Sequence, residues 1–154
     1  MLYFAYGSNL SKSAMRERAP GAKPVIGAVL PGHALVFESN EPPGAPDAYF
    51  ANVRAEANAV VLGALYDIDE RDLSALDVYE DVARGVYERL VLGISRADGV
   101  AADAITYRMR VLLPARFGAP SQAQLDQIRA GYADWGLDLR VLDGALESIK
   151  SRMA

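Results

Sequence analysis

The stretch Tyr6-Gly7-Ser8-Asn9-Leu10 has the residue types and spacing of an anion-binding turn. It ends a short apolar run that is typical of a strand, residues 3–6, and it leads directly into a polar segment that can form a helix. A strand that ends in Gly-Ser-Asn before a helix presents several backbone N–H groups at one point, and such groups bind anions. We therefore predict an anion pocket at this turn.

A second chemical candidate is Glu80, which follows a predicted helix over residues 70–79 with Asp69 as a good N-cap. At about 100° per residue, Glu80 falls within about 20° of Leu73, so its carboxylate points toward the core, with Asp77 on the same side. Burial and the negative end of the helix dipole both raise the pKa of such a carboxylate, which suits proton transfer near neutral pH. The alternative is a helix that ends earlier, with Glu80 a solvated acid and Asp77 the cap of a neighbouring turn.

Other chemistries are restricted by what the chain contains. It has no cysteine and one histidine, His33, so thiol nucleophiles, disulfides and a histidine-rich metal site are excluded, and we predict no metal site. A Ser-His-Asp triad would have to use His33 without a Gly-x-Ser-x-Gly elbow, and we interpret His33 as partly exposed or hydrogen-bonded. Residues 27–33 have phosphate-loop glycine spacing but no following Lys-Ser/Thr pair, so nucleotide binding is not expected.

The elements that must position the turn and the acid are mostly short strands. Apolar runs and alternation predict strands over residues 2–6, 25–30, 34–38, 49–54, 59–68, 86–94 and 105–112. In the last of these, Ile105, Tyr107, Met109 and Val111 alternate with Thr106, Arg108 and Arg110, which indicates a sheet with one face in water. Residues 39–47, with three prolines, are the clearest loop.

Few helices accompany these strands. They are expected after Asn9, over residues 70–79 and 122–135, and near residues 142–153. Because the strands come in runs with few helices between them, we predict an α+β fold with a mixed, barrel-like sheet of about six to seven strands and a few helices packed around it. The 154 residues are expected to form one domain, residues 1–154.

Composition limits the partners of the protein. The net charge is −4 and no run of Lys or Arg could follow a phosphate backbone, so nucleic acid is not an expected partner. The longest strongly apolar segment, residues 59–66, is far shorter than the roughly 20 residues of a membrane span. The first residues lack the features of a secretory signal, so we expect a cytoplasmic protein. The oligomeric state is left open, and a homodimer is compatible with the sequence.

Three motifs taken together resemble the γ-glutamylcyclotransferase family. They are Tyr6-Gly7-Ser8-Asn9-Leu10, Leu76-Asp77-Val78-Tyr79-Glu80 and Gly85-Val86-Tyr87-Glu88-Arg89. Their order, their separation by the strand over residues 59–68, and a later helix from Pro120-Ser121 to Gly136-Leu137 are similar to that family along nearly the whole chain.

The resemblance implies a small α+β fold with a closed or nearly closed sheet around a cavity. Family members cyclise a γ-glutamyl group to 5-oxoproline and release the attached amino acid or amine, without a metal or organic cofactor. The family's catalytic glutamate falls on Glu80, and its substrate loop falls on Tyr6, Gly7, Ser8, Asn9 and Leu10, while Tyr87 matches a cavity tyrosine. The implied partner is a small γ-glutamyl compound, and whether the loop holds its α-carboxylate or its carbonyl oxygen is left open.

One position departs from the family. An aromatic residue commonly stands where this chain has Gln124, and Ser121-Gln122-Ala123-Gln124 instead predicts a capping box in which Gln124 reaches back to the Ser121 N–H. A changed pocket wall leaves the substrate open, with a γ-glutamylamine as one alternative. A non-catalytic module that binds a small carboxylate is a separate alternative. Tyr132 and Trp135, on the Leu125–Ile128 stripe of the same helix, are interpreted as core residues.

Overall fold

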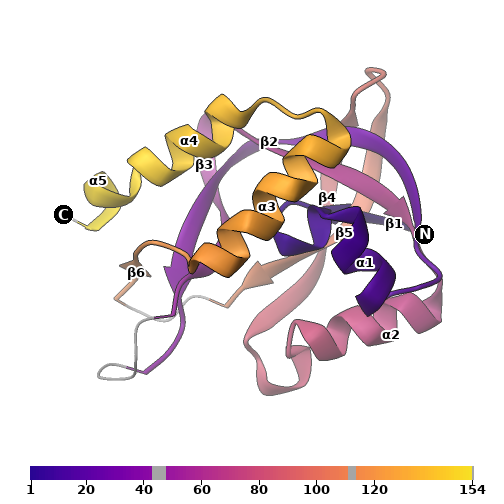
Figure 1. Cartoon of the computed structure of the whole chain (residues 1–154), viewed down its shortest axis with the longest axis horizontal. Coiled ribbons are helices and arrows are strands. Elements are labelled where there is room, and N and C mark those ends of the chain that lie inside the picture. Colours follow the sequence, from indigo (N-terminus) through magenta and orange to yellow (C-terminus); the bar gives the residue numbers. More distant parts are fainter. Residues whose placement is uncertain (43–47, 111–113, 154) are drawn as a thin grey trace.

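Six strands form a closed, mixed sheet in the computed structural model, which describes residues 1–42, 48–110 and 114–153. The order is β3-β1-β5-β4-β2, and β2 pairs again with β3 to close the barrel, while β6 extends the edge of β2 (Figure 1). Of the strand pairings in this described part of the chain, β1–β5 alone is parallel. The strands are β1 (Leu2–Ala5), β2 (Lys23–Ser39), β3 (Phe50–Asp67), β4 (Tyr87–Arg96), β5 (Ala101–Met109) and β6 (Arg116–Phe117). The predicted α+β barrel-like fold is confirmed.

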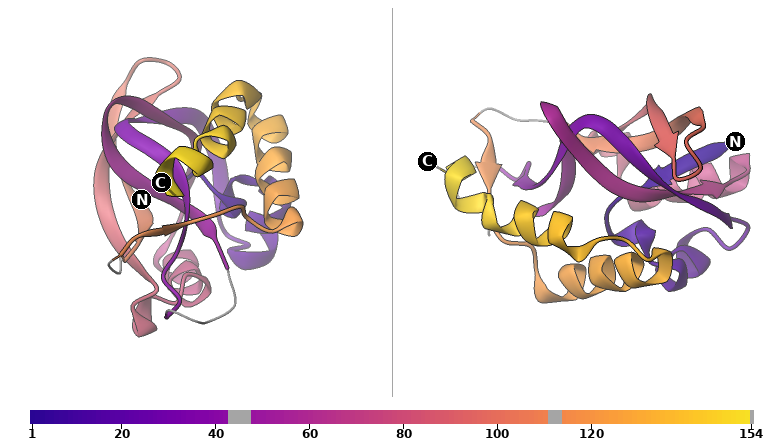
Figure 2. Two further views of the ribbon diagram at one scale, coloured as in Figure 1. Left: turned by 90° about the vertical axis from the view of Figure 1, so that its left-hand side faces the viewer. Right: turned by 90° about the horizontal axis from the view of Figure 1, so that it is seen from above.

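The helices cover the barrel on two sides. In Figure 1, α1 and α2 lie together at one end, and α3 crosses the front of the barrel toward α4 and α5, a layer that the views in Figure 2 show from its side and from above. None of the described helices is long and apolar enough to cross a membrane. The helices are the 3₁₀ turns η1 (Ser8–Leu10) and η2 (Val82–Arg84) and the α-helices α1 (Lys12–Arg18), α2 (Glu70–Tyr79), α3 (Gln122–Trp135), α4 (Leu139–Glu147) and α5 (Ile149–Met153).

Two pairs of predicted strands are each one long strand. Residues 25–30 and 34–38 are continuous in β2, where the register shifts between Pro31 and His33 and Gly32 has a φ of 69°. A bulge at these residues bends the strand without ending it, which explains why a Pro-Gly pair that is typical of a turn does not break β2. The Nδ1 atom of half-buried His33 lies 3.0 Å from the Pro31 carbonyl oxygen, as interpreted from the sequence.

The other pair of predicted strands, residues 49–54 and 59–68, is continuous in β3. Asn58, between them, has a positive φ of 67°, a conformation that asparagine tolerates better than most residues. Here too a turn-like residue bends the strand instead of ending it, so β2 and β3 form one long antiparallel hairpin.

The predicted alternation in β5 holds only in part. Tyr107 and Met109 are buried as expected, but Thr106, which was expected to face water, is fully buried and donates to the Phe4 carbonyl at 2.9 Å. Strand β5 lies between β1 and β4, and this hydrogen bond ties the Thr106 side chain to the neighbouring strand β1. Val111 of this pattern and residues 43–47 of the predicted loop lie outside the described residues.

Helix boundaries follow their capping residues. The predicted spans 70–79 and 122–135 are confirmed, with Asp69 as N-cap of α2 and Gly136, at a φ of 63°, ending α3. The C-terminal segment starts at Leu139, earlier than residue 142, because Asp138 caps α4 through the Arg140 N–H. A break at Ser148 divides the segment into α4 and α5.

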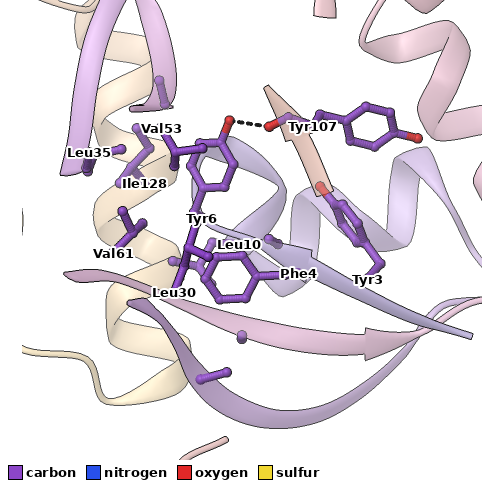
Figure 3. Close-up of a cluster of buried hydrophobic side chains, with 14 of the residues drawn as sticks. Tyr3, Phe4, Tyr6, Leu10, Leu30, Leu35, Val53, Val61, Tyr107 and Ile128 are labelled. Atoms are coloured by element: carbon purple, nitrogen blue, oxygen red, sulfur yellow. Dashed lines mark hydrogen bonds between the residues drawn. The ribbon is translucent and has the colours of Figure 1, made fainter. Parts of the chain in front are cut away.

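The core is built around β1, whose side chains meet residues from β2, β3 and α3 (Figure 3). Gly63 allows this arrangement, since a Cβ atom there would lie 2.3 Å from the Ala5 carbonyl oxygen and 2.6 Å from the Phe4 ring. The close approach of β3 fixes β1, and β1 in turn fixes the turn that follows it.

Candidate active site

A cavity of about 460 Å³ opens at the end of β1, between η1, the C-terminal end of α2 and the first turns of α3. Its size falls within the range of small-molecule sites. Its lining combines aromatic side chains with a few polar and charged ones, namely Tyr3, Tyr6, Gly7, Ser8, Asn9, Glu41, Phe50, Ala51, Tyr79, Glu80, Asp81, Arg84, Val86, Tyr87, Tyr107, Ala123, Gln124 and Gln127. The structure therefore brings both sequence candidates, the Gly-Ser-Asn turn and Glu80, to one cavity.

The turn after β1 presents backbone donors. Among the described residues, none accepts a hydrogen bond from the N–H groups of Gly7, Ser8 and Asn9, whereas the Leu10 N–H donates to the Gly7 carbonyl at 3.0 Å. Gly7 packs tightly, because a Cβ atom added at this residue would lie only 3.1 Å from the Cβ atom of Ala51. Three adjacent N–H groups at a cavity wall are suited to an anionic or carbonyl oxygen.

Glu80 is the C-cap of α2, and its N–H donates to the Leu76 carbonyl at 2.8 Å. The helix ends at Tyr79 as predicted, and the Glu80 side chain that follows it is half-buried and lines the cavity. Burial raises the pKa of Glu80 to about 7, against the opposing effects of the Arg18 charge and of a hydrogen bond from Asn9. The carboxyl group therefore exchanges a proton readily near neutral pH.

Asp77, the other acid on the same side of α2, has a different environment. Its carboxylate accepts from the Tyr107 hydroxyl at 2.7 Å and forms an ion pair with Arg89 at 3.3 Å. It is absent from the lining of the cavity. The structure therefore separates the two acids, with Glu80 in the cavity and Asp77 tying α2 to the barrel.

Arg18, at the end of α1, organises the polar side of the site. Its Nη1 atom donates to Asn9 Oδ1 at 2.6 Å and to Ser8 Oγ at 3.0 Å, and its guanidinium lies 3.9 Å from the centre of the Tyr79 ring. Asn9 in turn donates from Nδ2 to Glu80 Oε1 at 3.1 Å. The guanidinium thus fixes which end of the Asn9 amide faces the carboxylate.

Arg18 is a site residue that sequence reasoning missed. It lies four residues after Ala14 and three after Met15, and both of these are buried. Helical spacing therefore places a cation on the buried stripe of α1, and a charge at such a position was the signal available in the sequence.

Comparison with known proteins settles the family. The model of a family described as γ-glutamyl cyclotransferase, AIG2-like, matches residues 3–136 of the chain. The chain belongs to this cyclotransferase family. Among curated protein sequences, no match to the chain is found.

Solved structures share the cyclotransferase fold. One named γ-glutamyl cyclotransferase has a TM-score of 0.84 at 24% identity, with 97% of this chain and 87% of that chain covered. An uncharacterised protein from Homo sapiens has a TM-score of 0.82 at 25% identity, covering 96% and 86%. A yeast γ-glutamyl cyclotransferase specific to glutathione has a TM-score of 0.62 at 11% identity, covering 98% and 96%.

The cavity tyrosines of this cyclotransferase-family chain are tied to the barrel. The Tyr6 hydroxyl donates to the Tyr107 carbonyl at 2.6 Å (Figure 3), and the Tyr87 hydroxyl donates to the Ala51 carbonyl at 2.8 Å. Burial raises the pKa of both hydroxyl groups well above the usual value, so both remain neutral. Tyr6 and Tyr87 therefore shape the cavity as neutral walls.

Leu10, the last residue of the predicted substrate loop, lies in the core of the cyclotransferase fold and not in the cavity wall. Its side chain is fully buried, and its carbonyl accepts from the Tyr66 hydroxyl at 3.1 Å and from Trp135 Nε1 at 3.0 Å. The prediction that Leu10 contacts substrate is corrected by this geometry, because its N–H and carbonyl groups are both used within the fold.

The predicted role of Gln124 is also wrong. Ser121 Oγ does accept from the Gln124 N–H at 3.2 Å, but the Gln124 side chain does not return to Ser121. Its Oε1 atom accepts from the Ala51 N–H at 3.0 Å, and its Nε2 atom donates to the Tyr49 carbonyl at 3.0 Å. Gln124 therefore joins α3 to the start of β3 and lines the cavity, because an adjacent strand edge offers a donor and an acceptor at the spacing of one amide.

We expect Gln124→Ala to destabilise the protein by about 1–3 kcal/mol, because it removes both partners of a partly buried strand edge. Thermal unfolding checks this value. Gln122→Ala, which removes only an exposed hydrogen bond to Asp126 on the same helix, is the matched control and should change stability by less than about 0.5 kcal/mol. Equal unfolding temperatures for the two variants would contradict the bridging role.

Proposed function

We propose that the protein cyclises a γ-glutamyl group to 5-oxoproline and releases the attached amino acid or amine, with Glu80 as the general base and acid. The observation that carries the proposal is a carboxyl group with a pKa of about 7 in the same cavity as three backbone N–H groups that have no acceptor among the described residues. Membership of the cyclotransferase family supports the reaction class.

The proposed reaction needs two proton transfers at nearby nitrogen atoms. The neutral α-amine of the substrate attacks its own γ-carbonyl carbon, and the Glu80 carboxylate takes the proton that this nitrogen loses. The protonated Glu80 then gives that proton to the departing nitrogen as the γ-amide bond breaks. A carboxyl group that is partly ionised at neutral pH is suited to both transfers.

The turn would hold the substrate in its reactive shape. A γ-glutamyl chain is flexible, and cyclisation requires its amine to lie against its γ-carbonyl carbon. In this proposal the N–H groups of Gly7, Ser8 and Asn9 bind an oxygen of the substrate, either in the α-carboxylate or at the γ-carbonyl. Arg18 donates hydrogen bonds to the Ser8 and Asn9 side chains and so restrains this part of the cavity wall.

A product assay tests the proposal. The purified protein is incubated with a panel of γ-glutamyl amino acids and γ-glutamylamines, and 5-oxoproline is measured by mass spectrometry. We expect release from at least one compound, and the preferred leaving group identifies the substrate class. Calorimetric binding of panel members without any product would contradict turnover and support a module that only binds small carboxylates.

The acid limb of kcat/KM is expected near pH 7, because the ionised form of Glu80 acts as the base and burial raises the pKa of Glu80 to about 7. The Arg18 charge lowers the pKa of Glu80, so Arg18→Gln should move this limb to higher pH. Arg18→Lys keeps a positive charge and should move it less. Identical limbs in wild type and Arg18→Gln would show that Glu80 does not set the profile.

A further inference from the structure

Tyr3 carries a hydroxyl group that differs from those of the other buried cavity tyrosines. The side chain is 3% exposed, lines the cavity and packs edge-on against Tyr107, with ring centres 5.8 Å apart. The hydroxyl hydrogens of Tyr6, Tyr87 and Tyr107 have protein acceptors. Within the part of the chain that the structure describes, the Tyr3 hydroxyl accepts one hydrogen bond and its own hydrogen has no acceptor.

The orientation of Asn9 makes Tyr3 an available donor. Arg18 donates to Asn9 Oδ1, so the Asn9 NH₂ group faces the opposite way, toward Tyr3 and Glu80. Asn9 Nδ2 donates to the Tyr3 hydroxyl oxygen at 2.9 Å. A hydroxyl whose oxygen is occupied by a donor has to direct its hydrogen elsewhere. Burial, followed by the Glu80 charge, raises the pKa of Tyr3 far above its ordinary value, so that hydrogen is retained.

Tyr3 and Glu80 both line the cavity beside the Asn9 amide. Their oxygens contact the same nitrogen, Asn9 Nδ2, at 2.9 and 3.1 Å. Two hydrogen bonds that diverge from one NH₂ group place their acceptors about 5 Å apart. A single amide group can bridge such a gap, with its oxygen toward a donor and its nitrogen toward a proton carrier.

We infer that Tyr3 is a further catalytic residue, whose hydroxyl donates a hydrogen bond to the γ-carbonyl oxygen of the substrate while Glu80 serves the reacting nitrogens. This inference rests on the proposed function. When the α-amine attacks, the carbonyl π electrons move onto this oxygen, and the Tyr3 hydrogen bond strengthens as the negative charge develops. The charge returns to re-form the carbonyl as the C–N bond to the leaving group breaks, so Tyr3 ends the reaction with its hydrogen.

Tyr3→Phe tests the inference, because it removes one oxygen atom and keeps the ring. Loss of one donor to a developing oxyanion lowers kcat by about 10²-fold, with KM changed by less than about threefold. Tyr132→Phe is the matched control. Tyr132 is also fully buried, it lies outside the cavity lining, and its hydroxyl has no partner among the described residues, so removing that oxygen should leave kcat unchanged.

The outcomes separate this inference from the proposed function. Absence of 5-oxoproline release by the wild-type protein would overturn the proposed function and, with it, the role of Tyr3. Release by wild type with an unchanged kcat in Tyr3→Phe, or with a change in KM alone, would overturn only the role of Tyr3. Circular dichroism and thermal unfolding of the same samples establish that both variants are folded.

A substrate with a γ-thioamide gives a second readout that is independent of any folding defect. Sulfur is a weak hydrogen-bond acceptor, so wild type should be slowed by the thioamide more than the uncatalysed cyclisation is slowed. In Tyr3→Phe this extra slowing should disappear, because the donor is already absent. Equal thioamide effects in the wild-type reaction and the uncatalysed reaction would contradict a hydrogen bond to the γ-carbonyl oxygen.

Discussion

Glu80→Gln is expected to lower kcat for 5-oxoproline release by at least about 10³-fold, within the range attributed to general acid–base catalysis. The substitution keeps a side-chain oxygen that can accept from Asn9 Nδ2, now 3.1 Å from Glu80 Oε1, so the cavity should retain its shape. What is lost is the carboxyl group that we propose accepts the proton from the amine and returns it to the leaving nitrogen. Steady-state kinetics over a range of pH measure the effect.

The same variant should be more stable than wild type at neutral and higher pH. The pKa of Glu80 is raised from 4.5 to about 7, so between these values the folded protein retains a proton that the unfolded chain has lost. Stability therefore falls as pH rises through this window, by up to about 3 kcal/mol, and stays lower above it. Glu80→Gln removes this loss, which unfolding by denaturant at pH 5 and pH 8 would reveal.

Asp77→Asn is the matched control for Glu80→Gln, because both acids lie on the same side of α2. Asp77 is not part of the cavity lining and holds Tyr107 and Arg89 from α2, so its replacement should weaken stability and reduce kcat by less than about tenfold. A larger loss of kcat in Asp77→Asn than in Glu80→Gln would contradict the assignment of the proton transfers to Glu80.

Gly131→Ala is expected to destabilise the protein by about 2 kcal/mol and to lower kcat/KM by at least tenfold. A Cβ atom at this position in α3 would lie 2.7 Å from the Cβ atom of Leu10 and 2.9 Å from its backbone carbonyl carbon. Neither atom is the end of a flexible side chain, so the η1 turn and α3 must move apart. Because η1 carries Ser8 and Asn9, small displacements there change the site geometry.

Gly144→Ala, also a glycine-to-alanine change within an α-helix, is expected to have the opposite effect on stability. Gly144 is also helical, in α4, and apart from its chain neighbours and the backbone of its own helix no atom of the described residues lies within 4 Å of the position that its Cβ atom would take. Alanine there should stabilise the protein by about 0.5–1 kcal/mol, through the higher helix propensity of alanine. Thermal unfolding of the two variants checks the opposite signs, and stabilisation by both would contradict the tight contact at Gly131.

The sequence was sufficient to predict the parts of the site that depend on local pattern. The turn from Gly7 to Asn9 and the position of Glu80 beside α2 depend on strand and helix spacing over a few residues, and the family motifs agree with both. Asp69 at the N-terminus of α2 and Gly136 at the end of α3 were likewise readable, because capping residues act within a few residues of the chain.

Contacts between distant segments could not be predicted in this way. The Gln124 side chain contacts residues 73 and 75 positions away, so a local capping pattern was the only signal in the sequence. Leu10 belongs to the substrate motif by sequence, yet α3 and Trp135 enclose it in the core. Pro31 and Gly32 are typical of a turn, but pairing along β3 keeps β2 continuous. In each case the local sequence is compatible with more than one structure, and contacts with distant segments decide which one forms.

The proton-transfer role of Glu80 can be tested by single-turnover release of 5-oxoproline, measured with enzyme in excess over a γ-glutamyl substrate across pH 5 to 9. We expect the wild-type rate to rise with a midpoint near pH 7, following ionisation of a carboxyl group whose pKa is about 7. Folded Glu80→Gln should release no product above background. A wild-type rate without this midpoint, or product release by Glu80→Gln at the wild-type rate, would contradict this role of Glu80.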